Sequence, residues 1–125
     1  MNIPENLRYT REHEWAKVEN DAAVIGITDY AQNELGDIVF VELPKIGDKV
    51  ESMKPCGSIE AVKSVSDIYA PVSGEVIEVN QELESSPQLI NQDPYGKGWI
   101  IKIKMSNPQE LDQLLSAEDY QNLVG

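Results

Sequence analysis

The stretch from residue 57 to residue 79, GSIEAVKSVSDIYAPVSGEVIEV, decides the fold that this chain can form. Residues 58–62 alternate small or polar side chains with apolar ones, and residues 67–69 lead through a Pro-x-x-Gly segment into residues 75–79. Short alternating runs of this kind predict β-strands, and the Pro-x-x-Gly segment predicts a turn. Lys63 therefore lies near the tip of a predicted β-hairpin. Judged from its spacing alone, such a lysine is usually a solvated turn residue, because turns are polar and exposed.

The context of Lys63 adds a second interpretation. A strand, a tip lysine, a return strand and a Pro-x-x-Gly turn resemble the hairpin of lipoyl and biotinyl carrier domains, in which the lysine amine is joined to a prosthetic group through an amide. The tip lacks the flanking methionines of the biotinyl pattern and the Asp-Lys-Ala of lipoyl domains in 2-oxoacid dehydrogenases. Residues 60–67, EAVKSVSD, are instead similar to the Glu-Ser-Val-Lys-Ala-x-Ser-Asp tip of the glycine cleavage system H-protein family. Ala61 and Ser64 depart from that pattern conservatively.

Three further segments resemble the same family. His13-Glu14-Trp15 matches its His-Glu-Trp, and residues 26–32, GITDYAQ, resemble its Gly-Ile-Thr-Asp-x-Ala-Gln. Residues 91–99, NQDPYGKGW, resemble its Asn-x-Asp-Pro-Tyr-x-x-Gly-Trp run, and a tight Gly/Pro loop that fixes the last strand explains this run equally well. The first two segments do not belong to the generic lipoyl domain. The resemblance extends from residue 7 to about residue 120.

The expected fold is mainly β, a flattened barrel-sandwich hybrid of the lipoyl/biotinyl carrier type with a short connecting helix and C-terminal helices. We expect residues 1–125 to form a single lipoyl-carrier domain. Within it, an N-terminal hairpin (7–28) would precede a carrier core (36–105), and a helical extension (107–124) would follow.

Local signals predict the helices and loops of this domain. Thr28 as an N-cap and Gly36 as a C-terminal stop predict one short connecting helix. Apolar residues on one face after Asn107, and again after Ser116, predict two terminal helices that cover the sandwich. Residues 82–98 are polar and turn-rich around a short apolar pair, so turns and a loop are expected there.

The charge of the chain limits its partners. Its 125 residues include 10 basic and 22 acidic side chains, for a formal net charge of −12. Such a chain repels the phosphates of nucleic acids and anionic lipids, so we expect neither a nucleic acid nor a membrane as partner. Its charge would instead steer it toward basic patches on other proteins. No stretch is long and apolar enough to span a bilayer, and we expect a monomer.

Cysteine usage and the N-terminus indicate a compartment. Cys56 is the only cysteine, so no disulfide can form within the chain, which suits a reducing cytosol. We expect it to be a small, partly buried apolar side chain and not a redox group. The first ten residues lack the features of a signal peptide or a transit peptide. These features predict a cytoplasmic bacterial or archaeal protein.

No set of side chains in the sequence is typical of an active site. There is no convincing nucleophile and base, no phosphate-binding Gly-rich loop and no cluster of metal ligands. His13 is the only histidine, and no second His or Cys accompanies it at ligand spacing, so an ordinary hydrogen-bonded or exposed histidine is expected. The sequence therefore predicts a carrier protein and not an enzyme acting on its own.

The family resemblance implies what this carrier would carry. Lipoic acid, joined covalently to Lys63 by a lipoate-attaching enzyme, would take the aminomethyl group of glycine at the pyridoxal-phosphate-dependent decarboxylase (P-protein), with release of carbon dioxide. The arm would present that group to the tetrahydrofolate-dependent aminomethyltransferase (T-protein), and dihydrolipoamide dehydrogenase would then reoxidise it. Among the eight lysines, only Lys63 combines the tip position with the flanking motif.

The resemblance also implies a role for Glu14. In the family, the Glu of the His-Glu-Trp motif would hold the ammonium of the loaded arm when the arm folds back onto the protein, and a carboxylate suits an ammonium. The alternative is that Glu14 is a plain solvated strand residue. If Glu14 holds the ammonium, Glu14→Ala is expected to leave folding and lipoylation intact, because an exposed acid contributes little stability, while the loaded form loses ammonia faster.

Other functions remain open at this point. The chain could relay lipoyl or octanoyl groups to 2-oxoacid dehydrogenases, or act as an H-protein-like regulator. A different class is an unmodified β-sandwich interaction module in which Lys63 is only a surface lysine.

Overall fold

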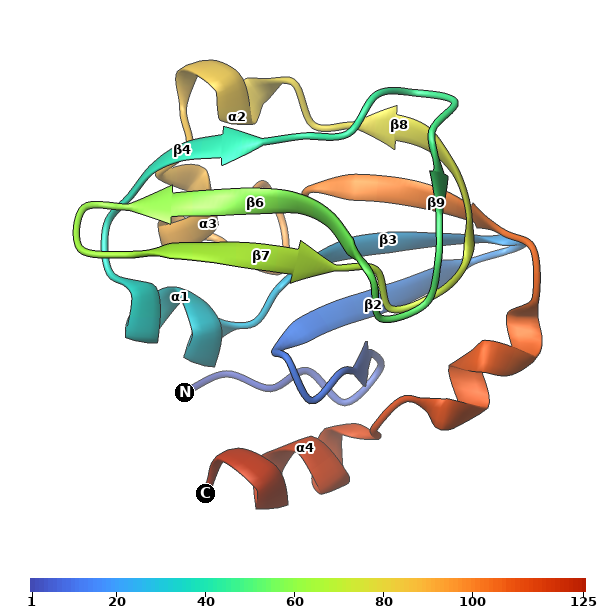
Figure 1. The fold of residues 1–125 in the computed structure, drawn as a ribbon. Coiled ribbons are helices and arrows are strands. Elements are labelled where there is room, and N and C mark those ends of the chain that lie inside the picture. The colour runs from blue at the N-terminus through green and yellow to red at the C-terminus, as the bar shows by residue number, and fades with distance from the viewer.

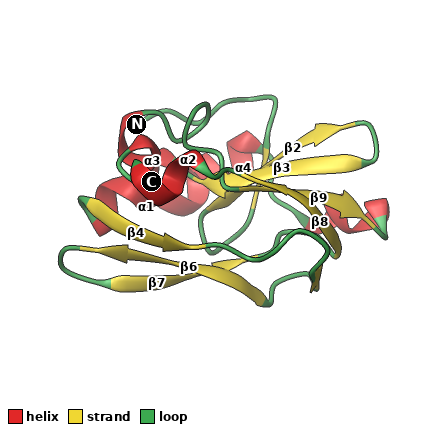
Figure 2. Ribbon diagram, turned by 90° about the horizontal axis from the view of Figure 1, so that it is seen from above, coloured by secondary structure: helices red, strands yellow, loops and turns green.

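Two antiparallel sheets form the body of the protein. The structure, a computed structural model, describes residues 1–125. The larger sheet has six strands in the order β1-β2-β3-β9-β8-β5, and the smaller sheet has three strands in the order β4-β6-β7. Figure 2 shows the sheets as two layers, and the helices α1 (Asp29–Leu35), α2 (Glu82–Ser85) and α3 (Leu89–Gln92) gather at one end of them. The strands of the larger sheet are, in that order, Arg8–Tyr9, Glu14–Glu19, Ala22–Ile27, Ile101–Met105, Gly74–Val79 and Lys49–Val50; those of the smaller sheet are Ile38–Glu42, Pro55–Ala61 and Val65–Tyr69.

The prediction of a mainly β sandwich with short helices is confirmed, with one correction to its shape. Both sheets are open, with β1 and β5 as the edge strands of the larger sheet and β4 and β7 as those of the smaller one, so neither closes into a barrel. The core lies between the sheets and consists of 17 buried residues. Side chains alternate between the faces of a strand, so every second residue points inward, and full burial of one such apolar side chain contributes about 1.5–3 kcal/mol. The inward residues include Ile25, Ile103 and Val76 from the larger sheet and Val41, Ile59 and Ile68 from the smaller one.

The N-terminal hairpin is continuous with the rest of the larger sheet. Strands β2 and β3 are joined by a turn in which Asn20 has a φ of +59°, a left-handed conformation that asparagine tolerates. Strand β3 pairs in turn with β9, from Ala22 opposite Lys104 to Ile25 opposite Ile101. Residues 7–28 and residues 36–105 therefore contribute to one sheet and one core.

The connecting helix forms as its local signals predict. Helix α1 spans Asp29–Leu35, and the Thr28 side chain accepts a hydrogen bond from the backbone N–H of Ala31 at 3.1 Å. The helix ends at Gly36, whose φ of +82° is in the left-handed region that favours glycine.

The prediction of turns and a loop over residues 82–98 is partly wrong. Two one-turn helices form there, α2 (Glu82–Ser85) and α3 (Leu89–Gln92). Each buries one apolar side chain, Leu83 in α2 and Ile90 in α3. Four residues are too few to show a helical period in the sequence, and the helices form because these two side chains pack into the core.

The C-terminal segment covers the N-terminal hairpin. Its first part, η1 (Pro108–Gln113), is a 3-10 helix without a side-chain cap, whereas α4 (Ala117–Val124) is an α-helix capped by Ser116. Tyr120 of α4 stacks on Tyr9 with ring centroids 4.7 Å apart. Figure 1 shows α4 beside the N-terminal segment. None of the helices is long and apolar enough to cross a membrane.

Candidate functional site

The β6–β7 hairpin presents Lys63 at its tip, as the sequence predicts. The backbone N–H of Ala61 donates to the carbonyl of Ser64 at 2.7 Å, and this hydrogen bond closes the turn over Val62 and Lys63. Neither of them has a positive φ, so the turn forms without a glycine. Lys63 is exposed and takes part in none of the three ion pairs. Figure 1 shows the tip at one end of the molecule, on the same side as α1.

The junction between α1 and β4 supports the tip from behind. The backbone N–H of Val62 donates to the carbonyl of Asp37 at 3.0 Å. The Lys63 side chain lies along Gly36, because a Cβ placed on Gly36 would be 3.3 Å from Cε and 3.7 Å from Nζ of Lys63. Glycine at this position therefore permits both the backbone turn and the close approach of the lysine.

Asn91 of α3 fixes this junction through its side chain. Its Nδ2 donates to the carbonyl of Gly36 at 2.8 Å and to Oε1 of Gln32 at 3.1 Å, and its Oδ1 accepts from the backbone N–H of Ile38 at 3.0 Å. Local sequence signals predict a loop at Asn91 and indicate no role for its side chain. The one sequence feature that could have drawn attention to Asn91 is its position at the start of the Asn-x-Asp-Pro-Tyr run. Its hydrogen-bond partners lie more than 50 residues away in the sequence, and no local pattern reveals partners at that distance.

Glu14 is buried, with 1% of its surface exposed. Its Oε1 accepts a hydrogen bond from the hydroxyl of Thr10, and its Oε2 accepts one from the backbone N–H of Tyr69 on β7 at 3.2 Å. Burial raises the pKa of the Glu14 carboxyl to about 8, against the lowering effect of these hydrogen bonds. The alternative of a plain solvated strand residue is wrong, and so is the reason given for expecting Glu14→Ala to leave folding intact. The alternating pattern fails here because Glu14, Trp15 and Ala16 are all buried.

The structure does not bring Lys63 and Glu14 together. Glu14 contacts Tyr69, which is six residues beyond Lys63, and six residues of extended strand span about 20 Å. Neither residue lines any of five cavities on the surface of the protein. An arm attached to Lys63 would have to run along the hairpin to approach Glu14.

The two other singled-out residues have structural surroundings. His13 Nδ1 lies 2.8 Å from the hydroxyl of Tyr120, its ring contacts those of Tyr30 and Tyr120, and burial lowers its pKa. It is an ordinary hydrogen-bonded histidine. Cys56 is partly buried against the core, and burial raises the pKa of its thiol to about 12, so the prediction of a small apolar side chain is confirmed.

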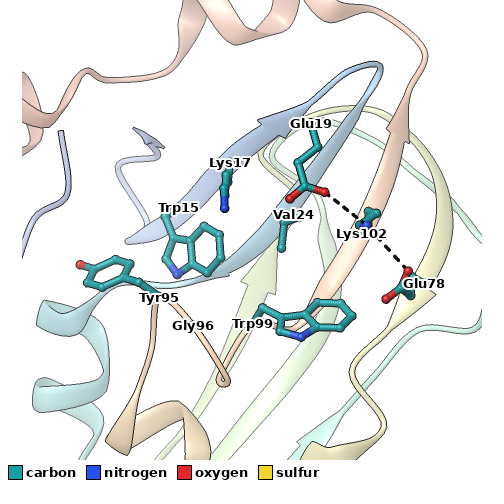
Figure 3. Close-up of a pocket in the computed structure, with 9 residues that line it drawn as sticks. All are labelled: Trp15, Lys17, Glu19, Val24, Glu78, Tyr95, Gly96, Trp99 and Lys102. Atoms are coloured by element: carbon teal, nitrogen blue, oxygen red, sulfur yellow. Dashed lines mark ion pairs between the residues drawn. The ribbon is translucent and has the colours of Figure 1, made fainter. Parts of the chain in front are cut away.

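A separate cavity of about 300 Å³ lies on the outer face of the larger sheet (Figure 3). Its walls include the rings of Trp15, Tyr95 and Trp99, and Lys102 on its rim pairs with Glu19 at 3.3 Å and Glu78 at 3.8 Å. Its lining residues belong to β2, β3, β8, β9 and the loop before β9, so the cavity is remote from the hairpin that bears Lys63.

Two facing antiparallel sheets with a lysine at a hairpin tip are the arrangement of the lipoyl/biotinyl carrier fold. The family model described as glycine cleavage H-protein matches residues 7–125. A glycine cleavage system H protein from Carboxydothermus hydrogenoformans is 58% identical over 122 residues, which cover 98% of this chain and 94% of that protein. A glycine cleavage system H protein from Staphylococcus carnosus is 55% identical over 125 residues, which cover 100% of this chain and 99% of that protein.

A solved structure agrees with these sequences. The crystal structure of a glycine cleavage system H protein from Mycobacterium marinum matches with a TM-score of 0.92 and 37% identity, and the match covers 98% of this chain and 99% of that one. The chain belongs to the glycine cleavage H-protein family.

Proposed function

We propose that this chain is the lipoyl-lysine carrier of a glycine cleavage system, with Lys63 as the attachment site. The observation that supports the proposal is the exposed Lys63 at the hairpin tip, inside the EAVKSVSD motif, in a chain of this family. The carrier takes the aminomethyl group of glycine from the P-protein to the T-protein and is then reoxidised by dihydrolipoamide dehydrogenase. The three partner enzymes catalyse these steps, and this chain moves the group between them.

The surroundings of Lys63 suit the attachment of lipoate. Lys63 is exposed and takes part in none of the ion pairs, and the residue beside its amine, Gly36, has no side chain that could obstruct an acyl group. When attached, lipoate supplies a disulfide that takes up the aminomethyl group and two electrons. The chain's own contribution is a rigid support, since the Asn91 side chain donates a hydrogen bond to the Gly36 carbonyl and the Val62 N–H donates one to the Asp37 carbonyl.

Glu14 is the residue that we propose to hold the ammonium of the loaded arm. It is a buried acid that takes part in none of the ion pairs, so its ionised form has no cation beside it. A buried charge is costly unless it is paired, and an ammonium would supply the missing partner. Because only 1% of Glu14 is exposed, the arm must displace part of the surrounding surface to reach it.

The attachment site is tested by intact mass. Protein produced in a lipoate-competent host should gain one lipoyl or octanoyl group, and Lys63→Arg should gain none, because a guanidinium is not an acyl acceptor under these conditions. Thermal unfolding of the variant should match that of the wild type, since the side chain is exposed. Unmodified wild-type protein would favour the unmodified interaction module instead, and a modified variant would place the site on another lysine.

The role of Glu14 is tested by the rate of ammonia release. Glu14→Gln keeps the shape and one of the two acceptor oxygens but cannot carry a charge, so the aminomethyl-loaded variant should release ammonia faster than loaded wild type when no T-protein is present. Equal rates would remove Glu14 from the proposal and leave Lys63 unaffected.

A further inference from the structure

Apolar side chains are concentrated on the surface around Lys63. Of the ten large hydrophobic side chains that are exposed, four belong to the hairpin tip and the neighbouring strand β4. Val62 is 75% exposed, Val65 is 69% exposed, and Phe40, the only phenylalanine of the chain, is 53% exposed. The fourth is Val39. Scattered exposed apolar residues need no explanation, but a cluster at one place indicates a contact surface.

Strand register places Phe40 and Val65 on one face of the smaller sheet. Phe40 pairs with Glu60, and Glu60 pairs with Val65, so the three form a row across β4, β6 and β7. Two residues further along each strand, a second row on the same face consists of Glu42, Ser58 and Asp67. The intervening Val41 and Ile59 point into the core. We call the outward set of Phe40, Glu42, Glu60, Val62, Val65 and Asp67 the tip face.

Position relative to Lys63 distinguishes among the partners that this surface could serve. Val62 directly precedes Lys63, and Val65 follows it by two residues. Phe40 is two strands away from Val65, and because adjacent strands are about 4.8 Å apart, the two residues are about 10 Å apart. Enzymes that act on the far end of a completed arm can do so at a distance from the tip. The enzyme that forms the amide must bring Nζ itself into its active site, and it therefore has to cover the residues beside Lys63.

We propose that the tip face is the docking surface for the enzyme that acylates Lys63. The partner it fits has an apolar pocket for Phe40 and Val65, surrounded by Lys or Arg side chains that pair with Glu60 and Asp67. In the reaction, the lone pair of Nζ forms the C–N bond to an activated acyl carbon, the bond from that carbon to its leaving group breaks with its electron pair, and a base of the enzyme takes the proton from Nζ. This inference rests on the proposed lipoylation of Lys63.

Matched substitutions test the apolar part. Val65→Thr and Phe40→Thr keep residues that favour strands but make the tip face polar, and Val18→Thr makes the same exchange as Val65→Thr at an exposed position of β2 in the other sheet. Each variant is titrated against a purified lipoate-attaching enzyme under steady-state conditions. We expect KM to rise about tenfold for Val65→Thr and Phe40→Thr with kcat unchanged, because uniform binding is lost, and Val18→Thr to match wild type.

The acidic part is tested in the same assay at two salt concentrations. Glu60→Gln should raise KM at low salt and have a smaller effect on KM at high salt, where exposed charges are screened. The matched control is Glu84→Gln, which makes the same exchange on α2. Thermal unfolding of every variant shows that the fold is intact.

The outcomes separate this inference from the proposed function. Normal acylation of both tip-face variants overturns the inference and leaves the carrier function standing. Normal acylation combined with slower aminomethyl transfer to the T-protein also overturns it, because the face would then serve another partner. Wild-type protein that accepts no acyl group overturns both.

Discussion

A buried carboxyl group with a raised pKa makes stability depend on pH, and Glu14 is such a group. Its pKa is about 8 in the folded protein, against an ordinary value of 4.5. The folded state therefore binds a proton more tightly than the unfolded state does. The resulting stability is fully present below about pH 4.5 and is lost as the pH rises through 8.

This predicts a difference between the wild type and Glu14→Gln. Between pH 5 and pH 8 the free energy of unfolding of wild type should fall relative to that of the variant, by at most about 1.4 kcal/mol per pH unit. Urea unfolding at several pH values measures the two curves. Parallel curves would mean that Glu14 ionises with its ordinary pKa, and its burial would then need another explanation.

The effect of removing the Glu14 side chain differs from the sequence-based expectation. Glu14→Ala deletes the acceptor of the Tyr69 N–H and of the Thr10 hydroxyl, both at buried or partly buried positions. An unsatisfied buried donor costs about 1–3 kcal/mol, so the alanine variant tests stability and function together. For this reason the glutamine variant is the better probe of ammonium binding.

At the scale of elements, the support of the hairpin tip depends on a single side chain from α3. Asn91→Ala would remove three hydrogen bonds and leave the backbone N–H of Ile38 without its acceptor. We expect a loss of about 1–3 kcal/mol in the free energy of unfolding. The matched control is Asn33→Ala on the exposed side of α1, which should be neutral or slightly stabilising because alanine has the higher helix propensity. Urea unfolding compares the two, and equal stabilities would show that the junction does not need Asn91.

The elements also show which parts of this protein its sequence predicts. The lysine hairpin and helix α1 were predictable because their signals are local: alternation around Lys63, a cap at Thr28 and a glycine at position 36. Helices α2 and α3 were missed because their formation depends on a core contributed by distant strands.

The same distinction applies to the candidate site. The tip lysine and its motif are contiguous in the sequence, so Lys63 could be identified without coordinates. The burial of Glu14 depends on Thr10 and on Tyr69, which is 55 residues away. The exposure of Phe40 depends on which face of β4 meets the core, and a bulge between Ile38 and Phe40 shifts that register.

For the whole molecule, the net charge of −12 predicts how the protein meets its partners. Long-range attraction to basic surfaces accelerates encounter, and salt screens it beyond about 8–10 Å at physiological ionic strength. The rate of aminomethyl transfer to the T-protein should therefore fall as salt rises. Stopped-flow rates over a range of sodium chloride concentrations measure this, and a flat profile would indicate that the charge serves only solubility.

The hydrogen bond between Glu14 and Tyr69 has a consequence for self-association. Strand β7 is an edge of the smaller sheet, and an open edge offers unpaired backbone groups to a second copy of the chain. The Glu14 carboxyl already occupies the N–H of Tyr69 at the far end of β7, and Asp67 adds an exposed acid to the same strand. Two copies that met along this edge would find a donor taken and like charges opposed. The hairpin that holds Lys63 can thus project from the molecule without becoming a template for aggregation.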